Sequence, residues 1–169
     1  NATLEVSNKY GNFNITTWNQ NRVEIEVTIT TESNSEKRAE EKLDQIRVDF
    51  NATTNRVSAK TIIDKGYSNW NWGWGDSNVS IKINYQIRMP ATNFLILSND
   101  YGAIVLDKLD AKAIIDCDYG SIDIGRLNAA DNELSFDYTK RVVIDYVKSA
   151  KINADYSDFR IEDAGVLNI

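Results

Sequence analysis

The fold of this 169-residue chain is decided by residues 95–106, which read Leu95-Ile96-Leu97-Ser98-Asn99-Asp100-Tyr101-Gly102-Ala103-Ile104-Val105-Leu106. The central Asp-Tyr pair recurs three more times, at Asp118-Tyr119, Asp137-Tyr138 and Asp155-Tyr156. Self-similarity at a nearly fixed period is typical of repeat architectures, in which each unit packs on its neighbours.

Each unit carries the alternation of apolar and polar residues that is typical of β-strands. Apolar residues stand four positions before each tyrosine and alternate again after it, and a small or polar residue follows the tyrosine. Period two indicates strands, and the small residue indicates a bend between them. Because stacked strands lie ~4.8 Å apart, equivalent side chains should form columns. The sequence predicts an all-β β-solenoid, similar to a parallel β-helix, built from repeats of about 18 residues.

A further copy of the unit lies near the start of the chain. Residues 4–15 parallel residues 95–106. Tyr10 matches Tyr101, whereas Lys9 stands where the other units have an aspartate. We therefore expect one domain over residues 1–169. Its first repeat copy should span 4–29, an insertion with a helix and a hairpin should span 33–90, and the other repeats should span 93–169.

The insertion has a different pattern. Capping-box spacing at Ser33 to Glu36, and an apolar stripe of Ala39, Leu43 and Ile46, predict one short amphipathic helix near 35–46 that covers one end of the solenoid. Strands are expected at 47–50, 57–63 and 79–89. The last two flank a loop rich in Gly, Asn and Trp, so we expect them to form a long hairpin with tryptophans at its tip.

The composition excludes several classes of function. The chain has no His and one Cys, so an intrachain disulfide, a Cys/His zinc site and histidine-dependent catalysis are excluded. The net charge is −6, and no cluster of basic residues is present, which argues against nucleic acid as a partner. The apolar runs are too short for a transmembrane segment.

The motif Asn-x-Tyr-Gly-x-Φ-x-Φ, in which Φ is an apolar residue, opens at Asn8 and again at Asn99. Together with the expected helix, the Trp-rich hairpin and the Asp-Tyr repeats, it resembles the bacterial putative-adhesin domain family. That family is related to the head GIN domain of autotransporter-adhesin-like proteins. The resemblance implies a β-solenoid protein that loses a signal peptide and is then either secreted or located in the cell envelope (periplasm or cell surface). It implies no enzymatic activity and transfers no site residues.

The alternation also predicts the environment of the repeated tyrosines, the repeated aspartates and Cys117. By alternation the repeated tyrosines share a face with the apolar residues, so we expect them to be buried in the core rather than to form a ligand platform. We expect the repeated aspartates to initiate the bends by bonding their own backbone, with a calcium site as the alternative. Cys117 should be a small buried hydrophobe in one column with Phe136 and Ala154.

The candidate ligand-binding residues are Tyr67, Trp70, Trp72 and Trp74, because three tryptophans within five residues are unusual in a loop. Indole faces can stack on sugar rings or anchor a protein interface. The alternative is a hydrophobic lid over one end of the solenoid. We expect no catalytic residues, no metal site and no cofactor.

The function that we predict is a non-catalytic binding or adhesion module of the envelope or the secreted fraction, with a surface glycan or an envelope protein as partner. One alternative is a structural or regulatory envelope protein that acts through protein–protein contacts. A third hypothesis is a carbohydrate-active enzyme with paired carboxylates.

Residues 166–169 form half a repeat with Leu167 and Ile169 facing inward. We expect this end to be covered by the 47–90 region or by a second copy, which would give a homo-oligomer.

Overall fold

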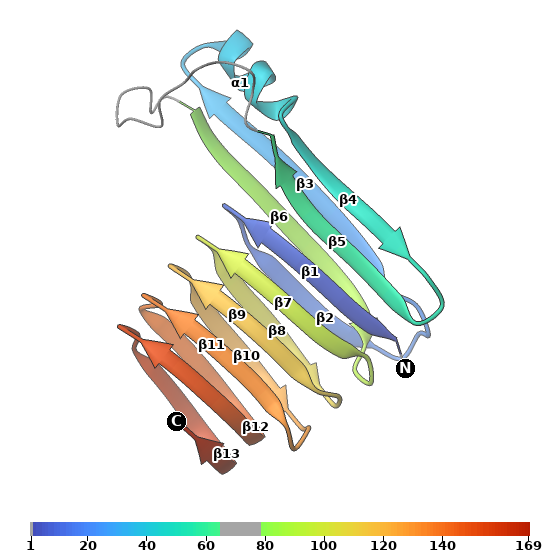
Figure 1. Ribbon diagram of the computed structural model, residues 1–169, viewed down its shortest axis with the longest axis vertical. Coiled ribbons are helices and arrows are strands. Elements are labelled where there is room, and N and C mark those ends of the chain that lie inside the picture. The colour runs from blue at the N-terminus through green and yellow to red at the C-terminus, as the bar shows by residue number, and fades with distance from the viewer. Residues whose placement is uncertain (1, 65–78) are drawn as a thin grey trace.

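The computed structural model describes residues 2–64 and 79–169. In this part of the chain thirteen strands and one short helix follow one another, and the protein is all-β (Figure 1). The elements are β1 (Thr3–Lys9), β2 (Phe13–Trp18), β3 (Glu24–Ser33), α1 (Glu36–Leu43), β4 (Ile46–Ala52), β5 (Arg56–Ile63), β6 (Val79–Pro90), β7 (Phe94–Asp100), β8 (Ala103–Leu109), β9 (Ala113–Asp118), β10 (Ser121–Leu127), β11 (Asn132–Asp137), β12 (Arg141–Asp155) and β13 (Phe159–Asn168).

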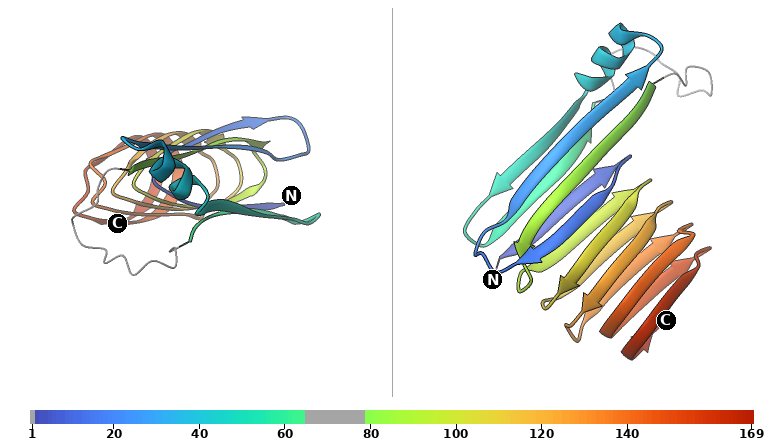
Figure 2. Two further views of the ribbon diagram at one scale, coloured as in Figure 1. Left: turned by 90° about the horizontal axis from the view of Figure 1, so that it is seen from above. Right: turned by 180° about the vertical axis from the view of Figure 1, so that it is seen from behind.

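The strands form one 13-stranded sheet that is folded over on itself and nearly closed, with two rows of strands facing each other (Figure 2). We call them the β2 row and the β1 row. The β2 row runs in the order β3, β6, β2, β8, β10 and β12, and the β1 row runs β4, β5, β1, β7, β9, β11 and β12. The long strand β12 joins both rows, and β13 pairs with β12 beyond them. In the β2 row, neighbouring strands from β6 to β12 are parallel, and β13 is parallel to β12. In the β1 row, neighbouring strands from β5 to β12 are parallel.

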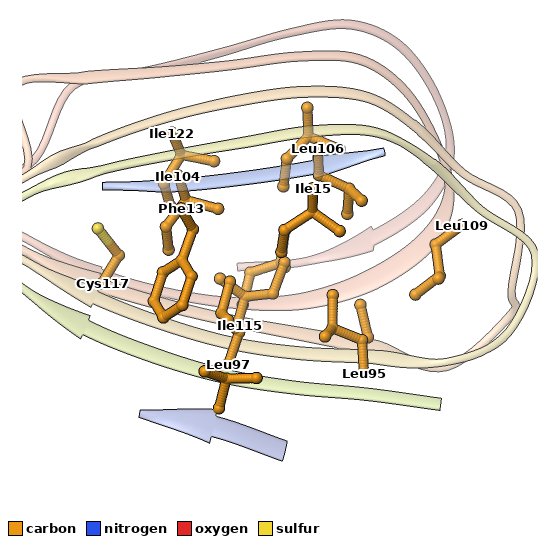
Figure 3. Close-up of a cluster of buried hydrophobic side chains, with 14 of the residues drawn as sticks. Phe13, Ile15, Leu95, Leu97, Ile104, Leu106, Leu109, Ile115, Cys117 and Ile122 are labelled. Carbon is orange, nitrogen blue, oxygen red and sulfur yellow. The ribbon is translucent and has the colours of Figure 1, made fainter. Parts of the chain in front are cut away.

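The hydrophobic core lies between the two rows (Figure 3). The expected inward residues of the β1 row are paired in register and buried: Leu97 with Ile115, Ile115 with Leu134, and Leu134 with Ile152. The β2 row contributes matching columns, such as Phe13, Ile104, Ile122 and Val142. The alternation in sequence therefore predicted the core face of these strands correctly.

The prediction that residues 57–63 and 79–89 form a hairpin is wrong. Strand β5 pairs antiparallel with β4 and parallel with β1, whereas β6 pairs antiparallel with β3 and parallel with β2. The two strands therefore belong to opposite rows. Each gains more by extending its row, where its apolar face joins the core, than by pairing with its neighbour in sequence.

The helix is shorter than predicted. It spans Glu36–Leu43, and its N-cap is Ser35 in place of the expected Ser33; the Ser35 side chain makes no cap hydrogen bond. None of its residues is buried, and Ile46 lies in β4. The helix packs beside β3, where the Thr31 hydroxyl donates to the carbonyl oxygen of Ala39 (2.9 Å). In residues 2–64 and 79–169, no helix is long and apolar enough to cross a membrane.

The expectation that the 47–90 region covers the last strand is also wrong for its described parts. Strands β4, β5 and β6 extend the rows at the end remote from β13 (Figure 1). Strand β13 pairs with β12 alone among the described strands, and Ile169 is 73% exposed. Leu167 packs against the core as expected.

Candidate binding surface

The repeated tyrosines point outward, so the prediction that they are buried is wrong. Tyr101, Tyr119, Tyr138 and Tyr156 are 51%, 51%, 48% and 82% exposed. All four, and Tyr10, have φ between 50° and 61°, and they are the described non-glycine residues with positive φ. A residue in this left-handed conformation ends the strand, so the alternation counted along the strand does not extend to its side chain. The flanking Asp and Gly were the sequence signal for such a bend.

The five tyrosines form one continuous stack, which we call the tyrosine ladder: Tyr10, Tyr101, Tyr119, Tyr138 and Tyr156. Successive ring centroids are 5.3, 5.1, 5.0 and 5.1 Å apart, and the ring planes differ by at most 13°. These values match offset stacking of aromatic side chains, which stabilises each pair by about 0.5–1.5 kcal/mol beyond its buried area.

Backbone hydrogen bonds fix each step of the ladder. The Tyr101 N–H donates to the carbonyl oxygen of Asp118, and the N–H groups of Tyr10, Tyr119 and Tyr138 make the equivalent bonds to Asp100, Asp137 and Asp155. The bends approach one another closely, because a Cβ on Gly102 would lie 1.8 Å from the carbonyl oxygen of Gly11. Glycine is therefore required at position 102 for these two bends to approach so closely, whereas Thr139 and Ser157 follow the tyrosine in the last two units.

The repeated aspartates lie beside the ladder in a second column, which we call the acidic column: Asp100, Asp118, Asp137 and Asp155. Asp118 accepts a hydrogen bond from the N–H of Asp137, and Asp137 accepts one from Asp155, both at 3.3 Å. These two carboxylates thus bond the neighbouring strand and not their own bend, which corrects the predicted mechanism. Among the described residues no group of three or more His, Cys, Asp or Glu is placed to hold a metal ion.

The charges of the acidic column act on their surroundings. Lys9 stands at the head of the column, its Nζ 2.7 Å from Asp100 Oδ2, and this hydrogen bond raises the pKa of the lysine. Burial, followed by the nearby charges of Asp118, Asp100 and Asp137, raises the pKa of Asp116. Desolvation and the neighbouring Tyr138 and Tyr101 raise the pKa of Tyr119, so its hydroxyl is protonated at neutral pH. The surface therefore presents phenols next to negative charge.

The column of side chains beneath the bends confirms the prediction for Cys117. Cys117 and Phe136 are fully buried, Ala154 is partly buried, and the three are paired in register. Burial raises the pKa of the Cys117 thiol to about 12, which makes it a poor nucleophile at neutral pH.

Sequence reasoning missed two residues at the head of this column, Asn8 and Asn99. Both are buried, and their side-chain amides donate to the carbonyl oxygens of Ile83 (2.9 Å) and Gly11 (3.1 Å). They satisfy backbone acceptors that the bends leave without a strand partner. Their shared place in the two Asn-x-Tyr-Gly motifs was the signal that could have identified them.

The sequence-predicted ligand residues Tyr67, Trp70, Trp72 and Trp74 lie in residues 65–78, outside the described residues. Their role as a binding platform or a lid stays a hypothesis.

No protein-family model matches the chain, and no curated protein matches it. Among solved structures, the chain is similar to a protein from Clostridium sporogenes described as a putative cell adhesion protein. The two share 7% sequence identity with a TM-score of 0.44, and the match covers 99% of this chain and 92% of that protein. Membership of the putative-adhesin domain family stays a prediction from the sequence motifs.

Proposed function

We propose that the protein is a non-catalytic binding module of the cell envelope or of the secreted fraction, and that the tyrosine ladder and the acidic column form its docking surface. The observation that carries this proposal is the exposure of the ladder, in which four stacked tyrosines are each about half exposed or more. Tyrosine is enriched at protein interfaces because it offers a large contact area with few rotatable bonds.

The backbone conformation of the ladder supports a role for the rings themselves. A left-handed residue with a Cβ costs roughly 1–2 kcal/mol, which glycine would avoid and asparagine would reduce. Tyrosine nevertheless occupies all five positions. Ring stacking offsets part of this cost. A row of five residues with strained backbone on one surface is a reason to test that surface for function.

The repeat architecture that we infer explains why this surface is periodic. The strand pairings of successive Asp-Tyr units are equivalent, since Asp100 pairs with Asp118, Asp118 with Asp137, and Asp137 with Asp155. These pairings support a β-solenoid of about 18 residues per turn, in which each turn presents one tyrosine and one carboxylate at the same edge.

The chemistry of the surface favours a cationic partner. Each ring face is partly covered by the next ring, so the ladder offers phenol oxygens as hydrogen-bond acceptors, flanked by carboxylates. Lysine and arginine side chains of a partner protein supply donors and the complementary charge. We therefore propose an envelope or extracellular protein with a basic surface as the partner.

The test measures binding of a biotinylated deca-lysine peptide by biolayer interferometry at about 50 mM and about 300 mM salt, where screening separates electrostatic from apolar contributions. One variant, Asp118→Asn with Asp137→Asn, removes two charges and keeps side-chain oxygens that accept the backbone bonds. A second, Tyr101→Asn with Tyr119→Asn and Tyr138→Asn, removes three rings and places a residue that tolerates positive φ. The matched control, Asp145→Asn with Asp163→Asn, removes the same charge from exposed positions away from the ladder.

We expect both ladder variants to weaken binding at least about tenfold, which is about 1.4 kcal/mol, and the control to bind like the wild type. Binding should also weaken at the higher salt concentration. Absence of binding by the wild type, or equal loss in the control variant, would overturn the proposal. Melting curves recorded in parallel show whether each variant is folded at the assay temperature.

A further inference from the structure

A second candidate site lies at the other ends of the β2-row strands, away from the tyrosine ladder. There a cleft of about 550 Å³ opens between the end of β2, residues 19–21, residues 90–92 and the end of β8. The volume is within the range of about 300–1,000 Å³ that is typical of small-ligand sites. Strand β2 separates this cleft from Tyr10 by the length of a six-residue strand, or about 20 Å.

The cleft exists because β2 and β8 separate after three residue pairs. They pair from Phe13 with Ile104 to Ile15 with Leu106 and no further. Beyond that point the Asp107 carboxylate takes the place of the missing backbone acceptor. It receives the N–H of Thr17 at 3.0 and 3.1 Å and the Thr17 hydroxyl at 3.3 Å. The strand ends are thereby held apart at a fixed separation.

One wall of the cleft is an indole that is held in place. The Trp18 Nε1–H donates to the carbonyl oxygen of Arg22 (3.0 Å), and the Arg22 guanidinium lies 5.0 Å from the indole centroid. Arg22 in turn is paired with Glu24. The ring therefore occupies one orientation before any ligand arrives, which reduces the entropy lost on binding.

The other walls are polar and electrically balanced. Three consecutive amide side chains, Asn19, Gln20 and Asn21, line the cleft, and none of them hydrogen bonds to another side chain or backbone group in residues 2–64 and 79–169. Lys108 and Asp110 add one positive and one negative charge. Asp110 Oδ1 accepts a bond from Asn128 Nδ2 (2.7 Å), which fixes the carboxylate and leaves Oδ2 without a partner among the described residues.

We propose that this cleft binds a neutral saccharide, with Trp18 beneath the ring and Asn19, Gln20, Asn21 and Asp110 on its hydroxyl groups. A saccharide ring has apolar C–H faces that fit an aromatic wall, and hydroxyl edges that both donate and accept hydrogen bonds. Amide side chains also do both, so they match adjacent hydroxyls. The balanced charge of the cleft favours a neutral ligand over an ionised one. This site is independent of the docking surface proposed above.

The experiment titrates the ¹⁵N-labelled chain with four disaccharides, cellobiose, chitobiose, lactose and maltose, and follows backbone amide shifts by NMR. We expect at least one disaccharide to shift the amides of residues 18–21 and 108–110 and to leave those of the tyrosine ladder unchanged. Trp18→Leu should weaken binding at least about tenfold, and Trp18→Phe, which retains an aromatic face, should weaken it less.

Two further variants keep the test decisive. Gln20→Ala with Asn21→Ala lies on an exposed loop, where substitution is tolerated, and should weaken binding with an unchanged melting temperature. Trp70→Ser with Trp72→Ser and Trp74→Ser should leave binding intact. The proposal is overturned if none of the four sugars shifts these amides at millimolar concentration. It is also overturned if binding is lost in the triple tryptophan variant and kept in Trp18→Leu.

Discussion

Tyr119 and Tyr138 stack with their ring centroids 5.0 Å apart and their planes parallel, although 18 other residues separate them in the chain. The contact follows from the pairing of the strands that precede them, because Asp118 pairs with Asp137 and each tyrosine comes next in sequence. The same relationship holds along the ladder from Tyr10 to Tyr156.

Substitution of Tyr101 tests whether the ladder is exposed and strained. Tyr101→Ala should lower the free energy of unfolding by about 2 kcal/mol, because two ring contacts of about 0.5–1.5 kcal/mol each are lost. Tyr101→Gly should lower it by about 1 kcal/mol less, because glycine adopts a φ of 61° without a Cβ penalty. Urea unfolding of the two variants checks the order. Leu97→Ala, a fully buried control, should cost about 2–5 kcal/mol.

Titration of Cys117 provides a pH test of the core. Burial raises its thiol pKa to about 12, so in the folded state the thiol keeps its proton at pH values at which the unfolded chain has lost it. The free energy of unfolding should therefore fall with rising pH from about pH 9 upward. The slope should be about 1.4 kcal/mol per pH unit steeper in the wild type than in Cys117→Ala. Equal slopes for the two proteins between about pH 9 and pH 11 would contradict the burial of the thiol.

Asp116 provides a test of the acidic column. Its raised pKa means that the folded state binds this proton more tightly than the unfolded state, so the ionised carboxylate destabilises the fold at neutral pH. Asp116→Asn should therefore melt at a higher temperature than the wild type at about pH 7, and the difference should shrink as the pH falls towards about 4. Asp145→Asn, at an exposed position outside the column, should change the melting temperature little at either pH. A difference for Asp116→Asn that grows on acidification would refute the assignment.

The exposed edge of β13 predicts self-association of the 169-residue chain. Among the described strands β13 has a partner on one side only, and Val166 and Ile169 are 67% and 73% exposed. Edge strands of this kind pair with other chains unless charges block them, and the charged residues of β13, Arg160, Glu162 and Asp163, lie in its first half, away from Val166 and Ile169. Sedimentation velocity should show concentration-dependent dimers or larger species. Val166→Lys with Ile169→Lys should suppress them, and Val105→Lys, at an exposed position within the sheet, should not. A wild-type chain that stays monomeric at high concentration would rule out this edge as an interface.

The sequence by itself determined the strands of the Asp-Tyr units and the face that each one buries. Apolar alternation around Leu97, Ile115, Leu134 and Ile152 is a local property, and burial of one face leaves a strand no other register. The place of Cys117 followed from the same alternation. The helix was predicted near its observed position because its periodicity is also local, although its ends and its lack of burial were not.

The tertiary structure alone decided where the bends point and which strands pair. The tyrosines leave the core because their φ is positive, and that conformation is stabilised by hydrogen bonds and ring contacts to the next unit, not by neighbours in sequence. Strands β5 and β6 lie in opposite rows because β5 pairs with β1 and β6 pairs with β2, and each thereby extends its row along the core. The cleft beside Trp18 depends on the separation of β2 from β8. These features rest on contacts between segments distant in the chain, and a periodicity within one segment carries no information about them.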